Sequence, residues 1–149
     1  MSKGSSGLFH GTVGEHATEE QLFQKANNAI KHLVEKTPNG NKKSMVVGAY
    51  DIKTGRVVAA FAGACPKRIA DELKERAKLV GGIGTHGVTK RNIVGVCAEF
   101  HAVNSLLLAG SRWQDIRLTP AIRPRIAMEI PYCDNCRIMF YDIIDKKRS

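Results

Sequence analysis

Three of the four cysteines in this chain fall in two short stretches, and each stretch has the pattern of a helix start. The first is GVCAEF, which places Cys97 ahead of a run with helical spacing of apolar residues. The second is IPYCDNC, which holds Cys133 and Cys136. Cysteines scattered through a core do not gather in this way. If the three side chains meet, the starts of two helices must face one point, and this is the strongest constraint on the fold.

A shared metal ion explains this pattern better than a disulfide framework does. Disulfide scaffolds are dense in cysteine and poor in core residues, whereas this chain has 149 residues and a hydrophobic fraction of 43%. The C-x-x-C spacing lets Cys133 and Cys136 face one point, and Cys97 adds a third thiolate. Three protein ligands with one position left for water are typical of catalytic zinc. The sequence therefore predicts a Zn²⁺ site at Cys97, Cys133 and Cys136.

Glu99 is a candidate acid–base group for that site. Residues two apart point in different directions in mid-helix, so Cys97 and Glu99 can serve one metal only if it lies off the helix N-terminus. There the unpaired backbone N–H groups and the helix dipole also favour thiolates. A carboxylate beside water activated by zinc can take a proton and return it to a leaving group. We therefore expect Glu99 to be catalytic.

Plainer interpretations stay open for the same cysteines. Cys133 and Cys136 suit a structural zinc half-site or a thioredoxin-like redox pair, and Cys97 alone suits a small buried core position. A structural site would need a fourth ligand and would leave Glu99 without a role. Cys65 has no partner at motif spacing, and we predict that it is a buried thiol.

Along the rest of the chain, helical and strand patterns alternate. The expected elements are a helix over 18–36 capped by Thr18, a hairpin of strands 44–51 and 55–63, a basic-faced helix over 66–80, a glycine-rich loop over 81–95, a helix over 97–110, a strand over 125–130, and a helix over 133–144 that either ends there or runs into a strand. This order predicts an α/β layered domain over residues 18–149. Residues 1–17 have the Ser/Gly-rich character of a linker or flexible N-terminal segment.

The charge of the chain favours a polyanionic partner. The net charge is +9, from 23 Lys and Arg against 14 Asp and Glu, and the basic residues gather in Pro66–Lys78, in Arg123–Arg125 and in the C-terminal DKKRS. Such a balance attracts nucleic acid or an anionic membrane, and it equally suits a solvated basic surface. No apolar run reaches the ~18 residues that span a bilayer, and no signal-peptide core is present, so membrane insertion is not expected.

The order C-A-E and then P-x-C-x-x-C resembles the zinc-dependent cytidine deaminase superfamily, whose signature is H/C-x-E with P-C-x-x-C. The hairpin VVGAYDIKTGRVVAAFAG is similar to that of small nucleoside deaminases. Within the superfamily the chain is most similar to the YwqJ-like bacterial polymorphic-toxin deaminases. The resemblance implies a three-layer α/β/α cytidine deaminase-like fold with a mixed central sheet, zinc on Cys97, Cys133 and Cys136, and Glu99 as the proton shuttle.

The resemblance also implies a biological setting. Such modules are typically released as the C-terminal part of a larger secreted protein, act in the cytoplasm of a target cell, and are neutralised by a cognate immunity protein. Free-nucleoside deaminases follow the hairpin with an N-x-E-N-type element that holds the ribose, whereas this chain has GACPKR there. That difference and the charge favour cytosine within nucleic acid, with single-stranded DNA slightly favoured over RNA.

Five residues are candidate substrate contacts. Tyr132 lies inside the second motif and is our preferred base-stacking side chain, and His86 lies in the glycine-rich loop. Ala98 and Phe100 flank Glu99, and Arg137 follows the last ligand, where its charge offsets the thiolates. Two alternatives stay open: a deaminase of a free nucleoside, nucleotide or base, and a non-catalytic zinc-binding interaction module.

Overall fold

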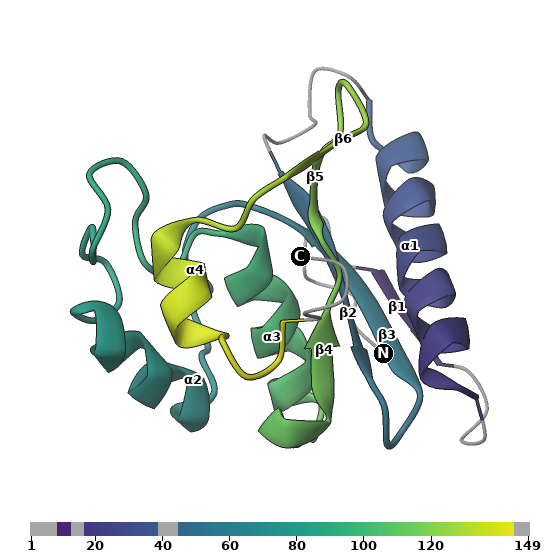
Figure 1. Cartoon of the computed structure of the whole chain (residues 1–149), viewed down its shortest axis with the longest axis horizontal. Coiled ribbons are helices and arrows are strands. Elements are labelled where there is room, and N and C mark those ends of the chain that lie inside the picture. Colours follow the sequence, from purple (N-terminus) through teal and green to yellow (C-terminus); the bar gives the residue numbers. More distant parts are fainter. Residues whose placement is uncertain (1–8, 13–16, 39–44, 145–149) are drawn as a thin grey trace.

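The computed structural model describes residues 9–12, 17–38 and 45–144, and it is a mixed α/β structure (Figure 1). The remaining parts of the expected linker 1–17 and of the expected domain 18–149 lie outside the described residues. In chain order the elements are β1 (Phe9–Thr12), α1 (Glu19–Lys36), β2 (Val46–Asp51), β3 (Arg56–Phe61), α2 (Asp71–Ala77), the 3₁₀ helix η2 (Lys78–Val80), α3 (Ala98–Leu108), the 3₁₀ helix η3 (Trp113–Asp115), β4 (Ile116–Leu118), β5 (Ala121–Arg123), β6 (Met128–Ile130) and α4 (Asp134–Met139).

The sheet is built around the hairpin that the sequence predicts. Strands β2 and β3 pair antiparallel with Ala49 opposite Val58, and the strand order is β1-β3-β2-β5-β6, with β4 also pairing with β2. All pairs between the named strands are antiparallel. The expectation of a mixed sheet is therefore not met by these strands. The one parallel contact among the described residues is an isolated bridge between Leu118 and Ile144.

Strand β1 corrects part of the linker interpretation. Residues Phe9–Thr12 pair antiparallel with β3, with Gly11 opposite Val57. Four residues are too few to show a strand period, and the free edge of β3 supplies the backbone partners that order them. The strand expected over 125–130 is also shorter than predicted, because residues 124–127 form the turn between β5 and β6.

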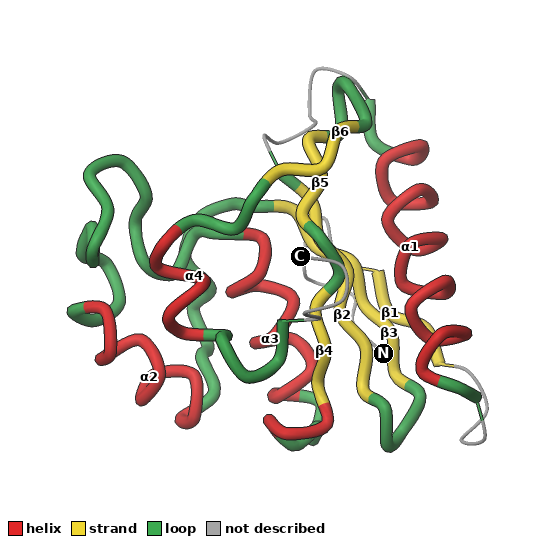
Figure 2. Tube along the Cα trace, viewed as in Figure 1, coloured by secondary structure: helices red, strands yellow, loops and turns green. Residues whose placement is uncertain are grey.

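Helices cover both faces of the sheet (Figures 1 and 2). Every residue of β2 is buried, and alternate side chains of a strand point to opposite faces. On one face α1 packs with its buried residues Leu22, Phe23, Ala26, Ala29, Ile30 and Leu33. On the other face α3 packs with Phe100, Val103 and Leu106. As expected, Thr18 is the N-cap of α1, and it forms a capping box with Gln21.

Helix α2 begins five residues later than the sequence predicts. The expected start was Pro66, but the side chain of Asn104 on α3 holds the preceding segment in a non-helical form. Its Oδ1 accepts a hydrogen bond from the Ala70 amide at 2.9 Å, and its Nδ2 donates to the Arg68 carbonyl at 2.8 Å. Ala70 is therefore the N-cap of α2.

The basic face expected on this helix is largely neutralised. Three cations on or next to α2 form ion pairs: Lys74 with Asp71, Arg76 with Asp142, and Lys78 with Glu75. The helix itself contains three acidic residues and two basic residues. The excess positive charge of the chain must therefore be sought elsewhere on its surface.

Packing behind α4 fixes the C-terminal part of the described chain. Trp113 stacks on Phe140 with ring centroids 5.7 Å apart, and the guanidinium of Arg76 lies 4.2 Å from the Trp113 ring centroid. Asp142 accepts hydrogen bonds from both Arg76 and Trp113. This cluster holds α4 against η2 and η3. The N-terminal end of α4 therefore faces the start of α3. Among the described residues, no helix is long and apolar enough to span a membrane.

Candidate metal centre

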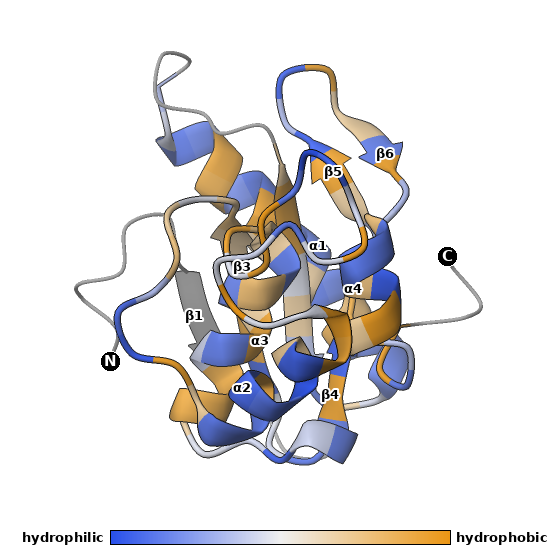
Figure 3. Cartoon of the chain, turned by 90° about the vertical axis from the view of Figure 1, so that its left-hand side faces the viewer, coloured by the Kyte–Doolittle hydropathy of each residue, from blue (hydrophilic) through white to orange (hydrophobic). Residues whose placement is uncertain are grey.

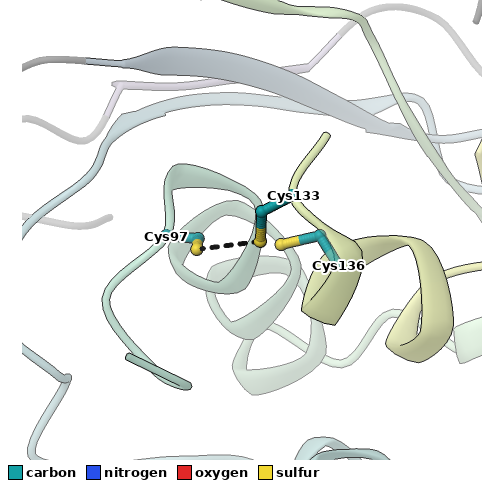
Figure 4. Close-up of side chains that lie close together, drawn as sticks. All are labelled: Cys97, Cys133 and Cys136. Atoms are coloured by element: carbon teal, nitrogen blue, oxygen red, sulfur yellow. Dashed lines mark hydrogen bonds between the residues drawn. The ribbon is translucent and has the colours of Figure 1, made fainter. Parts of the chain in front are cut away.

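The structure brings together the three cysteines that the sequence selects. The Sγ atoms of Cys97, Cys133 and Cys136 all lie within 4.8 Å of one another, and those of Cys97 and Cys133 are 3.7 Å apart (Figure 4). Ligand bonds of about 2.3 Å in a tetrahedron place two sulfurs about 3.8 Å apart. The three thiols therefore have the spacing that one metal ion needs.

Both helix starts point at this cluster. Cys97 is the N-cap of α3, with φ −68° and ψ 151°, and Cys133 is the N-cap of α4, with φ −69° and ψ 163°. This extended backbone takes each cysteine out of the helical direction, so a shared ion would lie off the two N-termini. Cys136 adds its buried thiol from the first turn of α4. Unpaired N–H groups at the two N-termini favour thiolates here.

Glu99 lies in the first turn of α3 and is only 2% exposed. Burial raises the pKa of Glu99 to about 7, the charge of Cys133 adds to the rise, and a hydrogen bond with the Cys136 side chain opposes it. The carboxyl group therefore faces the thiol cluster. Because Cys97 leaves the helix at the N-cap, the i, i+2 spacing does not separate the two side chains.

The thiols share their protons unevenly. Hydrogen bonds from Cys136 and Cys97 lower the pKa of Cys133, and the same bonds raise the pKa of both donors. The hydrogen bonds within the cluster favour a thiolate at Cys133, and the remaining sulfurs lose their protons when a cation takes the place of the proton. Three thiolates beside a buried carboxyl form a strongly anionic site, which suits a divalent cation.

Asn135 links the glycine-rich loop to the centre, and sequence reasoning missed it. It lies between Cys133 and Cys136 and is 1% exposed. Its Oδ1 accepts from the Val88 amide at 2.9 Å, and its Nδ2 donates to the His86 carbonyl at 3.0 Å. The available sequence signal was an amide residue between the two cysteines of the C-x-x-C motif. Such a side chain can hydrogen-bond the backbone of a neighbouring loop.

The five expected substrate contacts differ in their exposure to solvent. Phe100 and Ala98 are fully buried in the hydrophobic core, and substrate contact by these two side chains stays a prediction. Phe100 lies on the face of α3 that packs on the sheet, and sequence alone did not fix how the helix is rotated. His86 is exposed on the loop. Arg137 is exposed, and its Nε donates to the Tyr132 carbonyl at 3.1 Å.

Tyr132 is buried rather than exposed at the mouth of the centre. Its hydroxyl donates to the Thr119 carbonyl at 2.6 Å, and its ring is 8% exposed. It does line a hollow of about 630 Å³, together with Pro120, Glu129, Ile130, Pro131, Arg137 and Ile144. This hollow lies beside the start of α4, and its lining includes none of the three cysteines.

Two further residues, Cys65 and His101, concern the segment that follows β3. Cys65 is exposed, so the prediction of a buried thiol is wrong, because the segment after β3 runs over the surface before α2 begins. His101 on α3 donates from Nε2 to the Gly63 carbonyl at 3.1 Å. Burial lowers the pKa of His101, so this side chain is a neutral structural link between α3 and that segment.

Comparison of the chain with protein-family models, with curated proteins and with solved structures finds no match. The chemistry of the centre must therefore be argued from its own residues.

Proposed function

We propose that this chain is a zinc-dependent hydrolytic deaminase that converts cytosine to uracil in nucleic acid. The observation that carries the proposal is the cluster itself: three cysteine sulfurs within 4.8 Å of one another at two helix starts, with Glu99 buried in the first turn of α3 and hydrogen-bonded to the Cys136 side chain. The order C-A-E and then P-x-C-x-x-C supports it through resemblance to the cytidine deaminase superfamily. Helices on both faces of the sheet support the three-layer fold that this resemblance implies.

The donor set fits zinc. Thiolate ligands select soft or borderline cations, and three of them leave a fourth tetrahedral position open. A bound zinc ion would supply a Lewis acid that lowers the pKa of water at that position. The 3.7 Å spacing of the Cys97 and Cys133 sulfurs agrees with this coordination.

Glu99 would move the protons. Its carboxylate takes a proton from the attacking water and delivers it to the ring nitrogen of cytosine as the oxygen adds at C4. It then carries the second proton of that water to the amine, which leaves as ammonia. The balance is cytosine plus water to uracil plus ammonia. Burial of Glu99 keeps bulk water from exchanging these protons during the reaction.

The substrate class rests on charge and on a missing element. A net charge of +9 favours a polyanion, and GACPKR replaces the polar element that holds the ribose in free-nucleoside deaminases. A target base must then be unpaired or flipped out of a duplex, and single-stranded DNA is slightly favoured over RNA. The resemblance further supports action in a target-cell cytoplasm, delivery as the C-terminal part of a secreted protein, and neutralisation by a cognate immunity protein.

The test is a deamination assay with wild type, Glu99→Gln, and Glu72→Gln as a matched exposed control. Single-stranded DNA, duplex DNA, RNA and free cytidine are offered in parallel, and uracil is measured by mass. We expect uracil in a polymer with wild type and the control, and a loss of about 10² to 10⁴ in rate with Glu99→Gln.

Other outcomes separate the alternatives. Conversion of cytidine alone would assign the chain to free-nucleoside deaminases. Full zinc content with no uracil from any substrate would contradict the proposal and favour a zinc-binding interaction module. Zinc content and far-UV circular dichroism of each variant show whether a lost rate reflects lost chemistry or a lost fold.

A further inference from the structure

We propose that two segments at the surface, one a loop and one a β-hairpin, form arms that hold a single-stranded polynucleotide across the metal centre. The loop arm is residues 81–95, and the hairpin arm is residues 121–130, which contain β5, β6 and their turn. The inference rests on the proposed function, because it names the surface that would present the target base to that site. It moves the expected polyanion contact away from α2, whose cations are paired.

Each arm leads directly into a metal-binding cysteine. The loop arm ends two residues before Cys97, and the hairpin arm ends three residues before Cys133. Figure 1 shows the two arms on opposite sides of the start of α4, and Figure 2 shows the first as a projecting loop and the second as the strands β5 and β6 with their turn. A strand that contacts both arms therefore passes over the helix starts where the cysteines lie.

The arms carry unpaired positive charge. Lys90 and Arg91 on the loop arm and Arg123 on the hairpin arm are exposed, and none forms an ion pair with a described residue. Arg125 is also exposed on the hairpin arm. The loop arm contains no Asp or Glu, and the hairpin arm contains only Glu129. Such cations bind phosphates and release condensed counterions.

The same arms expose large apolar side chains. Val88 is 54% exposed, Ile126 is 57% exposed and Met128 is 60% exposed. Figure 3 shows hydrophilic and hydrophobic residues side by side at the tip of the hairpin arm. Apolar side chains of this kind pack on base faces or enter between bases, which would keep a target base unstacked. Unstacking a duplex to reach its base faces costs a few kcal/mol per step, so a single strand is favoured as the partner of both cations and apolar side chains.

Both arms are held in place before any ligand binds. The neck of the loop arm is closed by hydrogen bonds from the Gly84 amide to the Val94 carbonyl and from the Val94 amide to the Thr85 carbonyl, at 2.9 and 2.8 Å. Asn135 fixes its tip to α4. The hairpin arm pairs Ile122 with Glu129. Surfaces ordered in advance lose little conformational entropy on binding.

The experiment measures binding apart from chemistry. A fluorescently labelled oligo(dT) has no cytosine, so its anisotropy reports binding alone. The arm variant carries Lys90→Ala, Arg91→Ala and Arg123→Ala, and the matched control carries Lys67→Ala, Lys74→Ala and Lys78→Ala at exposed positions on or near α2. We expect the arm variant to bind at least tenfold more weakly, with a salt slope lower by about 2, since each single-strand phosphate contact contributes about 0.7. The control is expected to change affinity less than about twofold.

A second variant separates stacking from charge. Val88→Ser with Ile126→Ser and Met128→Ser is expected to weaken binding several-fold while leaving the salt slope unchanged. Oligo(U) in place of oligo(dT) distinguishes RNA from DNA, and equal dependence on the arms with both would support the inference. Zinc content of each variant shows that the centre is intact.

Three outcomes would overturn the inference: equal weakening by the arm and control variants, tighter binding of duplex than of single strands, or arm-dependent binding to phosphatidylserine vesicles with none to oligonucleotides. Its failure is distinct from failure of the proposed function. Arm-dependent binding without uracil in the deamination assay would support the arms as a binding surface and contradict the deaminase proposal. Uracil formed in a polymer equally well by the arm variant would support the deaminase proposal and contradict the role of the arms.

Discussion

The Oδ1 atom of Asn135 accepts a hydrogen bond from the amide of Val88 at 2.9 Å, across 47 positions of the chain. This bond links the glycine-rich loop to the C-x-x-C motif. Replacing Asn135 with Ala removes two part-buried hydrogen bonds, which together contribute about 1–3 kcal/mol. We therefore expect Asn135→Ala to lower the free energy of unfolding by that amount and to speed amide exchange at Val88. Asn104→Ala on the far part of α3 is the comparison, and it should leave Val88 protection unchanged.

Gly87 lies between His86 and Val88, the two loop residues whose backbone groups hydrogen-bond to Asn135. Its φ is +64°, and an added Cβ would collide with the Asn135 side chain. Gly87→Ala should therefore destabilise the protein by more than about 1 kcal/mol. Gly82→Ala is a matched control, since its φ is +101° and a Cβ there has no neighbour within 4 Å. If urea denaturation shows equal losses of unfolding free energy for the two variants, the loss comes from backbone strain alone and the predicted collision with Asn135 is contradicted.

Metal content should depend on the clustered cysteines and not on Cys65. We expect wild type and Cys65→Ser to hold about one zinc per chain, and Cys136→Ser to lose most of it, because two thiolates bind far less tightly than three. Elemental analysis after dialysis measures the stoichiometry. Full retention of zinc by Cys136→Ser would contradict the three-cysteine centre.

Asp142 should make stability depend on acid pH. Burial alone would raise its pKa, but hydrogen bonds from Arg76 and Trp113 lower it below the ordinary value of 3.8. The folded state therefore binds this proton more weakly than the unfolded state, so the stabilisation is present above about pH 4 and is lost as the pH falls below it. Wild type should exceed Asp142→Asn in stability at pH 7, and the difference should shrink at pH 3.

Fluorescence of Trp113 follows this unfolding directly, because it is the single tryptophan of the chain and accepts the Arg76 guanidinium on its ring. Taking the difference between the two proteins cancels the contribution of Asp51, whose pKa is also lowered. A difference that stays constant between pH 7 and pH 3 would show that Asp142 contributes no charge-dependent stability.

Local sequence signals predicted the long elements and the position of the cysteines. Thr18 caps α1 as expected, the central hairpin is in place, and Gly110 follows the end of α3 with a φ of +103°. The convergence of Cys97 with Cys133 and Cys136 was also predictable, since thiolates at two helix starts have a common chemical use.

What the sequence could not provide depends on tertiary contacts. Strands β4, β5 and β6 have three residues each, which is too short for a period to appear. The start of α2 is set by Asn104, which is 34 positions from Ala70. The burial of Phe100 and Tyr132 follows from helix rotation and from the position of Thr119, and no local pattern encodes either.

The start of α3, at the cysteine cluster, lacks the side-chain cap that α1 has. Thr18 caps α1 through its side chain, whereas Cys97 makes no side-chain cap bond at the start of α3. A good cap contributes about 1 kcal/mol, so the first turn of α3 lacks that stabilisation while the thiols hold no ion. Cation binding and folding are then linked. A change that strengthens cation binding also stabilises the folded first turn, and a change that stabilises this turn strengthens cation binding to the same extent. The supply of a cation that the three sulfurs can bind would thus affect how long the folded protein persists.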